Sequence, residues 1–187
     1  IITPISVSGN TSQFYGNYPS PLLLNSTGSS NYIHNTNSAD SIIRIYEGYS
    51  AYAGLTYNGS VFLWGLPEAG GQIDNYGQHN ADDLHNIVNI CSSRYAFSAL
   101  RSNGTVLIWG HMGNYMYNEI PDNIEQNNVK KICSNRYSFA FLRNNGTVFV
   151  WGDWSYGGKN TNTIQALSDV KEIYNTENGF IALKETD

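Results

Sequence analysis

Histidine, cysteine and acidic side chains are the groups in this chain that could bind a metal ion or attack a substrate. None of the four histidines stands at ligand spacing from another histidine or from a cysteine. His79 and His85 flank Asp82 and Asp83, a pattern that we interpret as a solvated acidic loop. The sequence also lacks a nucleophile elbow and a phosphate-binding glycine loop. We therefore expect a protein that is not an enzyme, with no catalytic residue, no metal site and no cofactor.

The two cysteines occupy equivalent positions, because Cys91 and Cys133 each follow an isoleucine in related segments. Tyr46 and Tyr174 stand at the same position in two further segments. A position that accepts both cysteine and tyrosine is typical of a packing slot between structural units. The alternative is a disulfide between neighbouring units, which would require Cα atoms about 5–6 Å apart.

Aromatic side chains in segments rich in Gly, Asn and Asp are the candidates for contact with a ligand or a partner: Tyr115, Tyr117, Trp154 and Tyr156. An amphipathic ring beside polar groups suits stacking on a sugar or a protein interface. The alternative is that these rings fill gaps between structural units.

Asn-x-Ser/Thr sequences mark candidate glycosylation sites at Asn10, Asn25, Asn58, Asn103 and Asn145. The last three asparagines precede a glycine, and Asn-Gly has a steric reason of its own in a tight turn. Glycosylation is expected only if the chain is secreted by an organism that performs it.

These side chains are set in an internal repeat, which is the strongest pattern in the chain. Three copies end in Trp-Gly and a fourth, incomplete copy follows: residues 43–65, 88–110, 130–152 and 170–187. Trp64, Trp109 and Trp151 are separated by 45 and 42 residues, and Asn-Gly pairs keep the same spacing. A repeat of this period indicates small units that are stable because they pack against their neighbours. We expect the three tryptophans to be structural wedges between these units.

Each unit is predicted to contain a β-hairpin, because Asn-Gly stands between two apolar runs. Asn145-Gly146, for example, separates a strand at 138–142 from one at 147–151. We expect a type I′ turn, in which both central residues have positive φ. The second strand is apolar throughout, which is typical of a strand covered on both faces. Loops, with one more short edge strand each, are expected at residues 66–86, 111–128 and 153–169.

The order of an isoleucine strand, an aromatic-and-leucine strand, Asn-Gly-Thr/Ser and an apolar run ending in Trp-Gly resembles the repeat of the regulator of chromosome condensation family. The resemblance extends over residues 42–187 and is most specific in residues 96–110 and 138–152. Residues 70–73, Gly-Gly-Gln-Ile, are similar to the Gly-Gln-Leu-Gly stretch of that family, with Asp74 in place of the final glycine.

The resemblance implies a β-propeller of the short-period kind found in bacterial surface and secreted proteins. The Gly-x-x-His sequence common in the family is absent, and the chain has Ser93-Arg94-Tyr95 and Asn135-Arg136-Tyr137 instead. The loops on which the nuclear member's exchange activity depends are not identifiable. The resemblance therefore implies the fold and not that activity.

The fold class that we expect is all-β, a propeller-like array of about three and a half blade repeats. Residues 1–40 do not repeat and are interpreted as an extended N-terminal arm, and residues 41–187 as the array. Its repeats are expected at about 43–86, 88–128, 129–169 and, in part, 170–187. The last repeat stops at its hairpin turn, which leaves a strand edge to be covered. A longer parent chain, the arm in cis, or the arm of a neighbouring copy would each cover it.

The amino-acid composition excludes some classes of partner. Lys and Arg total 10 and Asp and Glu 15, for a net charge of −5, and charged residues make up 13%, against roughly a quarter in ordinary domains. Without a basic stripe, nucleic acid is not an expected partner. No apolar stretch approaches the ~20 residues of a membrane span.

Three functions are compatible with these features. We expect a non-catalytic, secreted or cell-surface binding or scaffold module, extracellular in location, with a protein or carbohydrate partner. The alternative is a structural subunit of an extracellular filament or oligomer, assembled with copies of itself by donation of the N-terminal strand. The third is an intracellular adaptor or guanine-nucleotide exchange factor.

Overall fold

The structure is a computed structural model that describes residues 42–73, 83–111, 128–159 and 161–184. The arm predicted for residues 1–40 lies outside the described residues, and so do Tyr115, Tyr117, Asn10 and Asn25.

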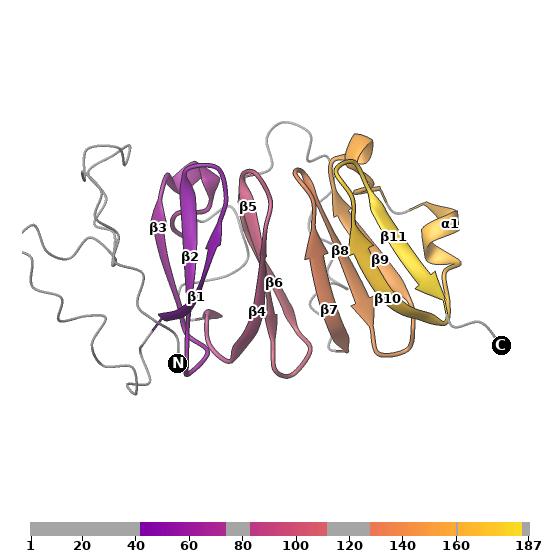
Figure 1. The fold of residues 1–187 in the computed structure, drawn as a ribbon, viewed down its shortest axis with the longest axis horizontal. Coiled ribbons are helices and arrows are strands. Elements are labelled where there is room, and N and C mark those ends of the chain that lie inside the picture. Colours follow the sequence, from indigo (N-terminus) through magenta and orange to yellow (C-terminus); the bar gives the residue numbers. More distant parts are fainter. Residues whose placement is uncertain (1–41, 74–82, 112–127, 160, 185–187) are drawn as a thin grey trace, which may run out of the picture.

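Four antiparallel sheets follow one another along the chain and lie side by side in the same order (Figure 1). The first sheet contains β1 (Ile42–Glu47), β2 (Ala51–Thr56) and β3 (Val61–Gly65). The second contains β4 (Ile87–Ser92), β5 (Ala96–Arg101) and β6 (Val106–Gly110). The third contains β7 (Val129–Ser134), β8 (Ser138–Arg143) and β9 (Val148–Gly152). The fourth contains β10 (Val170–Asn175) and β11 (Phe180–Lys184). The array is open: the first and fourth sheets stand at opposite ends of the row (Figure 1).

Along the chain, the described parts of the connections after β3 and β9 include the 3₁₀ turns η2 (Pro67–Ala69) and η5 (Trp154–Tyr156) and the helix α1 (Asn162–Gln165). Side-chain caps favour helix in the last two, because Asp153 Oδ1 accepts from Ser155 N and Thr161 Oγ1 from Ile164 N. The predicted edge strand in residues 153–169 is therefore wrong for the described part of that segment.

The three Asn-Gly hairpins form as predicted, but the predicted type I′ turn is wrong. Positive φ occurs at Gly104 (84°) and not at Asn103. Gly104 N donates to Arg101 O at 2.9 Å, and Arg101 N donates to Thr105 O at 2.8 Å. This pattern belongs to a three-residue loop, a type I turn followed by a left-handed glycine. Asn103 Oδ1 accepts from Thr105 N at 3.0 Å, so the asparagine stabilises the turn with its side chain instead of with a left-handed backbone.

The second and third sheets each pack one face on the sheet before and the other on the sheet after. In every sheet we call the face on the side of the preceding sheet the leading face and the opposite face the trailing face. The trailing face of the first sheet presents small and branched side chains, including Ala53 and Leu55, to the leading face of the second, including Ile90, Leu107 and Trp109. Equivalent residues form the second-to-third and third-to-fourth interfaces. The core therefore consists of three repeated layers between sheets, as in a propeller.

The last strand of the hairpin is covered on both faces where two neighbouring sheets are described. All five residues of β9 are buried, as are the first four of β6. In β3 the prediction is wrong, because Phe62 is exposed and Val61 and Leu63 are half-buried. The reason is position, since β3 belongs to the sheet at the end of the row (Figure 1).

The three repeated tryptophans are buried and stack on a cross-strand aromatic partner within their sheet. Trp109 lies opposite Phe97, with ring centroids 5.5 Å apart and an interplanar angle of 13°. Its indole Nε1 donates to Gly70 O of the preceding repeat at 3.1 Å. Trp109 thus packs within its own sheet and donates a hydrogen bond to the connection that follows the first sheet, as expected for a structural wedge.

Backbone hydrogen bonds join neighbouring sheets at the hairpin turns. The turn glycines Gly59, Gly104 and Gly146 accept through their carbonyl oxygens from the first residue of the next sheet, at 2.8, 3.1 and 3.0 Å. A Cβ atom on Gly104 would lie 2.8 Å from Asn128 N. Glycine is required there by both its φ and this close approach.

Candidate binding face

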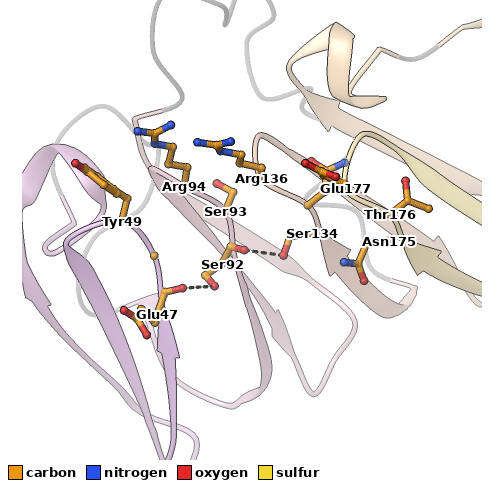
Figure 2. Close-up of a pocket in the computed structure, with 12 residues that line it drawn as sticks. Glu47, Tyr49, Ser92, Ser93, Arg94, Ser134, Arg136, Asn175, Thr176 and Glu177 are labelled. Carbon is orange, nitrogen blue, oxygen red and sulfur yellow. Dashed lines mark hydrogen bonds between the residues drawn. The ribbon is translucent and has the colours of Figure 1, made fainter.

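The turns between the first and second strands of every sheet gather around one open hollow of about 750 Å³ (Figure 2). These turns lie at the opposite strand ends from the Asn-Gly hairpins. We call the surface that they form the turn face. Its residues come from all four sheets: Glu47, Gly48, Tyr49, Ser92, Ser93, Arg94, Ser134, Asn135, Arg136, Asn175, Thr176 and Glu177.

Hydrogen bonds between successive turns hold this face together. Tyr49 N donates to Arg94 O and Arg94 N donates to Arg136 O, both at 2.8 Å. Beside them, Ser92 Oγ donates to Glu47 O and Ser134 Oγ to Ser92 O, both at 2.7 Å (Figure 2). The turns are thereby fixed relative to one another across three sheets, which is a preorganised arrangement for binding.

The central position of the turn is occupied by Tyr49, Arg94, Arg136 and Glu177 in the four sheets, in chain order. Figure 2 shows these four side chains along one edge of the hollow, with the two arginines on neighbouring turns. Along this edge the side chains are therefore neutral at Tyr49, cationic at the two arginines and anionic at Glu177, while Glu47 adds a second carboxylate near Tyr49.

Arg94 is held in place by aromatic rings. Its guanidinium carbon lies 4.8 Å from the ring centroid of Tyr49, 5.1 Å from that of Tyr95 and 5.9 Å from that of Tyr137. Its Nη1 donates to Tyr137 Oη at 2.7 Å. This hydrogen bond raises the pKa of Arg94 above its ordinary value, against the opposing effect of burial. The result is a permanent cation in a fixed orientation.

Arg136 is the more accessible of the two cations. Its side chain is exposed, and its guanidinium carbon lies 5.3 Å from the Tyr137 ring centroid. Among the residues that the structure describes it forms no ion pair. A guanidinium with free donors beside a second, immobilised guanidinium is suited to bind a carboxylate.

The two described aromatic residues that were predicted to contact a ligand have different environments. Trp154 is 53% exposed, and Lys159 Nζ lies 3.9 Å from its ring centroid. Tyr156 instead packs edge-on against Tyr137, with centroids 4.6 Å apart, and its carbonyl oxygen accepts from Asn135 Nδ2 at 2.8 Å. Trp154 is thus available for contact, while Tyr156 supports the turn face from behind.

The described glycosylation candidates, Asn58, Asn103 and Asn145, are exposed in the hairpin turns at the far end of the strands from the turn face. Each side-chain oxygen accepts a backbone hydrogen bond within the turn, at 3.0 to 3.1 Å. These bonds show the turn chemistry that Asn-Gly implies.

Cys91 and Cys133 are free thiols that pack between sheets. Cys91 Sγ donates to Ile132 O in the next sheet at 3.4 Å. Burial raises the pKa of Cys91 to about 11 and that of Cys133 to about 12. Both thiols therefore stay protonated at neutral pH and fill packing slots, as the sequence analysis expected.

Sequence reasoning singled out neither Arg94 nor Arg136 as a binding residue. The sequence does contain a pattern that marks them, because Arg-Tyr stands in two consecutive repeats where the family commonly has Gly-x-x-His. This pattern indicates a binding face because the fold places the two turns side by side.

Among residues 42–73, 83–111, 128–159 and 161–184, no three His, Cys, Asp or Glu side chains are grouped so as to hold a metal ion. Over the same residues, none of the helices has the length and apolar character needed to cross a membrane.

Comparison with known structures identifies the fold. The chain is similar to yeast RCC1 (Prp20), crystallised with Kap60, with a TM-score of 0.56 and 21% identity over 78% of this chain and 42% of that protein. It is also similar to human WBSCR16, with a TM-score of 0.53 and 17% identity over 79% of this chain and 46% of that protein. No protein-family model and no curated protein sequence matches the chain.

The fold is that of the β-propellers built from the regulator of chromosome condensation repeat, which confirms the resemblance seen in the sequence. The chain spans less than half the length of these two proteins, and its sheets form an open part of such a ring. At these identities the similarity establishes the fold alone.

Proposed function

We propose that this chain is a non-catalytic binding module whose turn face takes up acidic side chains of a partner protein. The observation that carries the proposal is the pair of neighbouring cations, exposed Arg136 and tyrosine-clamped Arg94, in a hollow to which all four sheets contribute. Guanidinium groups bind carboxylates through paired, charge-assisted hydrogen bonds. Arginine and tyrosine are also the residues in which binding energy concentrates at protein interfaces.

The remainder of the face supports a protein partner over a single small anion. Glu47 and Glu177 flank the two arginines, so a free anion would be repelled at both ends of the hollow. A peptide can place its carboxylate over the centre and neutral or basic groups over the ends. Exposed Tyr49 adds apolar surface at one end.

The absence of catalysis is part of the proposal and rests on two observations. Both thiols keep their protons at neutral pH, so neither is a ready nucleophile. The turn face carries arginine, serine and glutamate side chains and no histidine, and histidine is the most common general acid–base residue.

A peptide titration tests the proposal. A fluorescent glutamate-rich peptide and a glutamine-rich peptide of equal length are titrated with the chain, with anisotropy as the readout, at low and at physiological salt. We expect the glutamate-rich peptide to bind more tightly, and its affinity to fall as salt screens the charges. Equal affinity of the two peptides would contradict the proposal.

We further propose an extracellular or cell-surface location. The exposed sequon residues Asn58, Asn103 and Asn145 support it. Expression through the secretory pathway of a glycosylating host, followed by endoglycosidase treatment and mass spectrometry, is the test. A glycan on at least one of these asparagines is expected, and a chain secreted without any glycan would remove this support.

A further inference from the structure

The leading face of the first sheet exposes side chains that every later sheet buries. Ile45 and Phe62 are 45% and 43% exposed. The equivalent residues of the second sheet, Ile90 and Leu107, are each 2% exposed because they pack on the first sheet. The first sheet therefore presents an interface surface that has no occupant among the described residues.

The trailing face of the fourth sheet shows the reverse pattern at the other end of the row. Leu183 is 49% exposed and Ile181 is 55% exposed. Their equivalents in the third sheet, Leu142 and Ala140, are fully buried beneath the fourth sheet. Among the described residues neither face has an occupant, and the strands β10 and β11 present the side chains that the first two strands of an inner sheet contribute to each internal interface.

From this correspondence we infer that a second copy of this chain docks its first sheet on the fourth sheet. The contact continues the internal stacking, with the leading face of one copy on the trailing face of the other. The same contact forms at both ends, so two copies related by a two-fold axis close one ring. Apolar faces of this kind are rarely left open to solvent.

The size of the known rings supports two copies over a longer series. The chain matches 42% and 46% of the lengths of yeast RCC1 and human WBSCR16. Two copies of the 187-residue sequence therefore correspond to most of the length of either protein. The ring would also extend the turn face, since the first-strand turns of the second copy would continue the row of Tyr49, Arg94, Arg136 and Glu177. Docking of the two copies needs no ligand at that face.

Mass measurement by light scattering on the 187-residue chain and its variants tests the inference. The wild type is expected at twice the mass of one chain. Ile45→Arg alters the leading face and Leu183→Arg the trailing face, and each variant alone is expected at half the wild-type mass. Val88→Arg is the matched control: Val88 is 54% exposed within the second sheet, so this variant should keep the wild-type mass. Circular dichroism verifies that each variant is folded.

Mixing the two single variants gives the sharper result. Ile45→Arg retains an intact trailing face and Leu183→Arg an intact leading face, so one good interface can form between them. We expect the mixture to recover a 1:1 dimer that neither variant forms alone. A wild type that stays monomeric at its highest soluble concentration would overturn the inference. So would a Leu183→Arg variant that remains fully dimeric, because two leading faces would then be pairing with each other.

Discussion

Arg94 of the second sheet donates a hydrogen bond from Nη1 to Tyr137 Oη of the third sheet, 2.7 Å away. This bond links two sheets at the turn face and fixes the guanidinium of Arg94, which lines the hollow together with Arg136. One hydroxyl group thereby contributes both to the packing of two repeats and to the placement of a binding residue.

We predict that Tyr137→Phe weakens binding of the glutamate-rich peptide without unfolding the chain. The ring and its contacts with Arg94 and Tyr156 are retained, and only the hydrogen-bond acceptor is lost. Loss of one positioning bond corresponds to about a two- to tenfold decrease in affinity. Anisotropy titration measures it, and an unchanged affinity would show that the hydroxyl does not position Arg94 for binding.

Trp109→Ala should destabilise the fold strongly, because it removes a buried ring that stacks on Phe97 and its bond to Gly70 O. Truncation of a buried tryptophan costs about 3–5 kcal/mol. Trp154→Ala is the control, since the ring is half exposed, and should cost less than about 1 kcal/mol. Urea unfolding followed by far-UV circular dichroism compares the two. Equal losses would contradict the assignment of Trp109 as a wedge between sheets.

A Cβ atom at the hairpin turn should disturb the junction between two sheets. Gly104 has a φ of 84°, and a Cβ there would lie 2.8 Å from Asn128 N. Gly104→Ala is therefore expected to reduce the free energy of unfolding by at least about 1–2 kcal/mol. Gly179→Ala serves as the control, because the nearest atom to its Cβ would be Thr176 Oγ1 at 3.8 Å. Thermal unfolding of both variants measures the difference, and Gly104→Ala should unfold at the lower temperature. Equal unfolding temperatures would contradict the prediction.

The buried thiols predict a loss of stability in alkaline solution. Cys91 and Cys133 have pKa values of about 11 and about 12 in the folded chain, against 9.0 without burial. Above pH 9 the unfolded chain releases protons that the folded chain retains, so the free energy of unfolding falls as pH rises from about 9 to 11. The decline should reach at most about 1.4 kcal/mol per thiol per pH unit.

The double variant Cys91→Ala, Cys133→Ala isolates this effect from the titration of tyrosine and lysine. Its urea midpoint should decline less steeply between about pH 8 and pH 10.5 than that of the wild type. Identical slopes for the two proteins would show that the thiols do not couple folding to pH.

The elements that could be predicted from the sequence are those encoded by neighbouring residues. Asn145-Gly146 between two apolar runs predicted its hairpin, and the spacing of Trp109 and Trp151 predicted a stack of equivalent sheets. The type of turn was not predictable from Asn-Gly alone, because the same dipeptide also fits a three-residue loop in which only glycine has positive φ.

The candidate site was harder to predict because it consists of single residues from four separate repeats. Arg94 and Arg136 are 42 positions apart in the sequence and become neighbours only through the stacking of their sheets. Trp154 was predicted as a contact residue and is exposed, whereas Tyr156 beside it packs on Tyr137. Composition cannot distinguish two such rings, since their exposure depends on the cap that Asp153 gives to η5.

Binding of the glutamate-rich peptide by two arginine variants tests the assignment of the turn face most directly. Arg136→Gln removes the exposed cation of the hollow, and Arg44→Gln removes an exposed arginine of β1 that does not line it. The expected result is a decrease in affinity of about tenfold or more for Arg136→Gln and little change for Arg44→Gln. Wild-type affinity in Arg136→Gln, or equal losses in both variants, would contradict a binding site at the turn face.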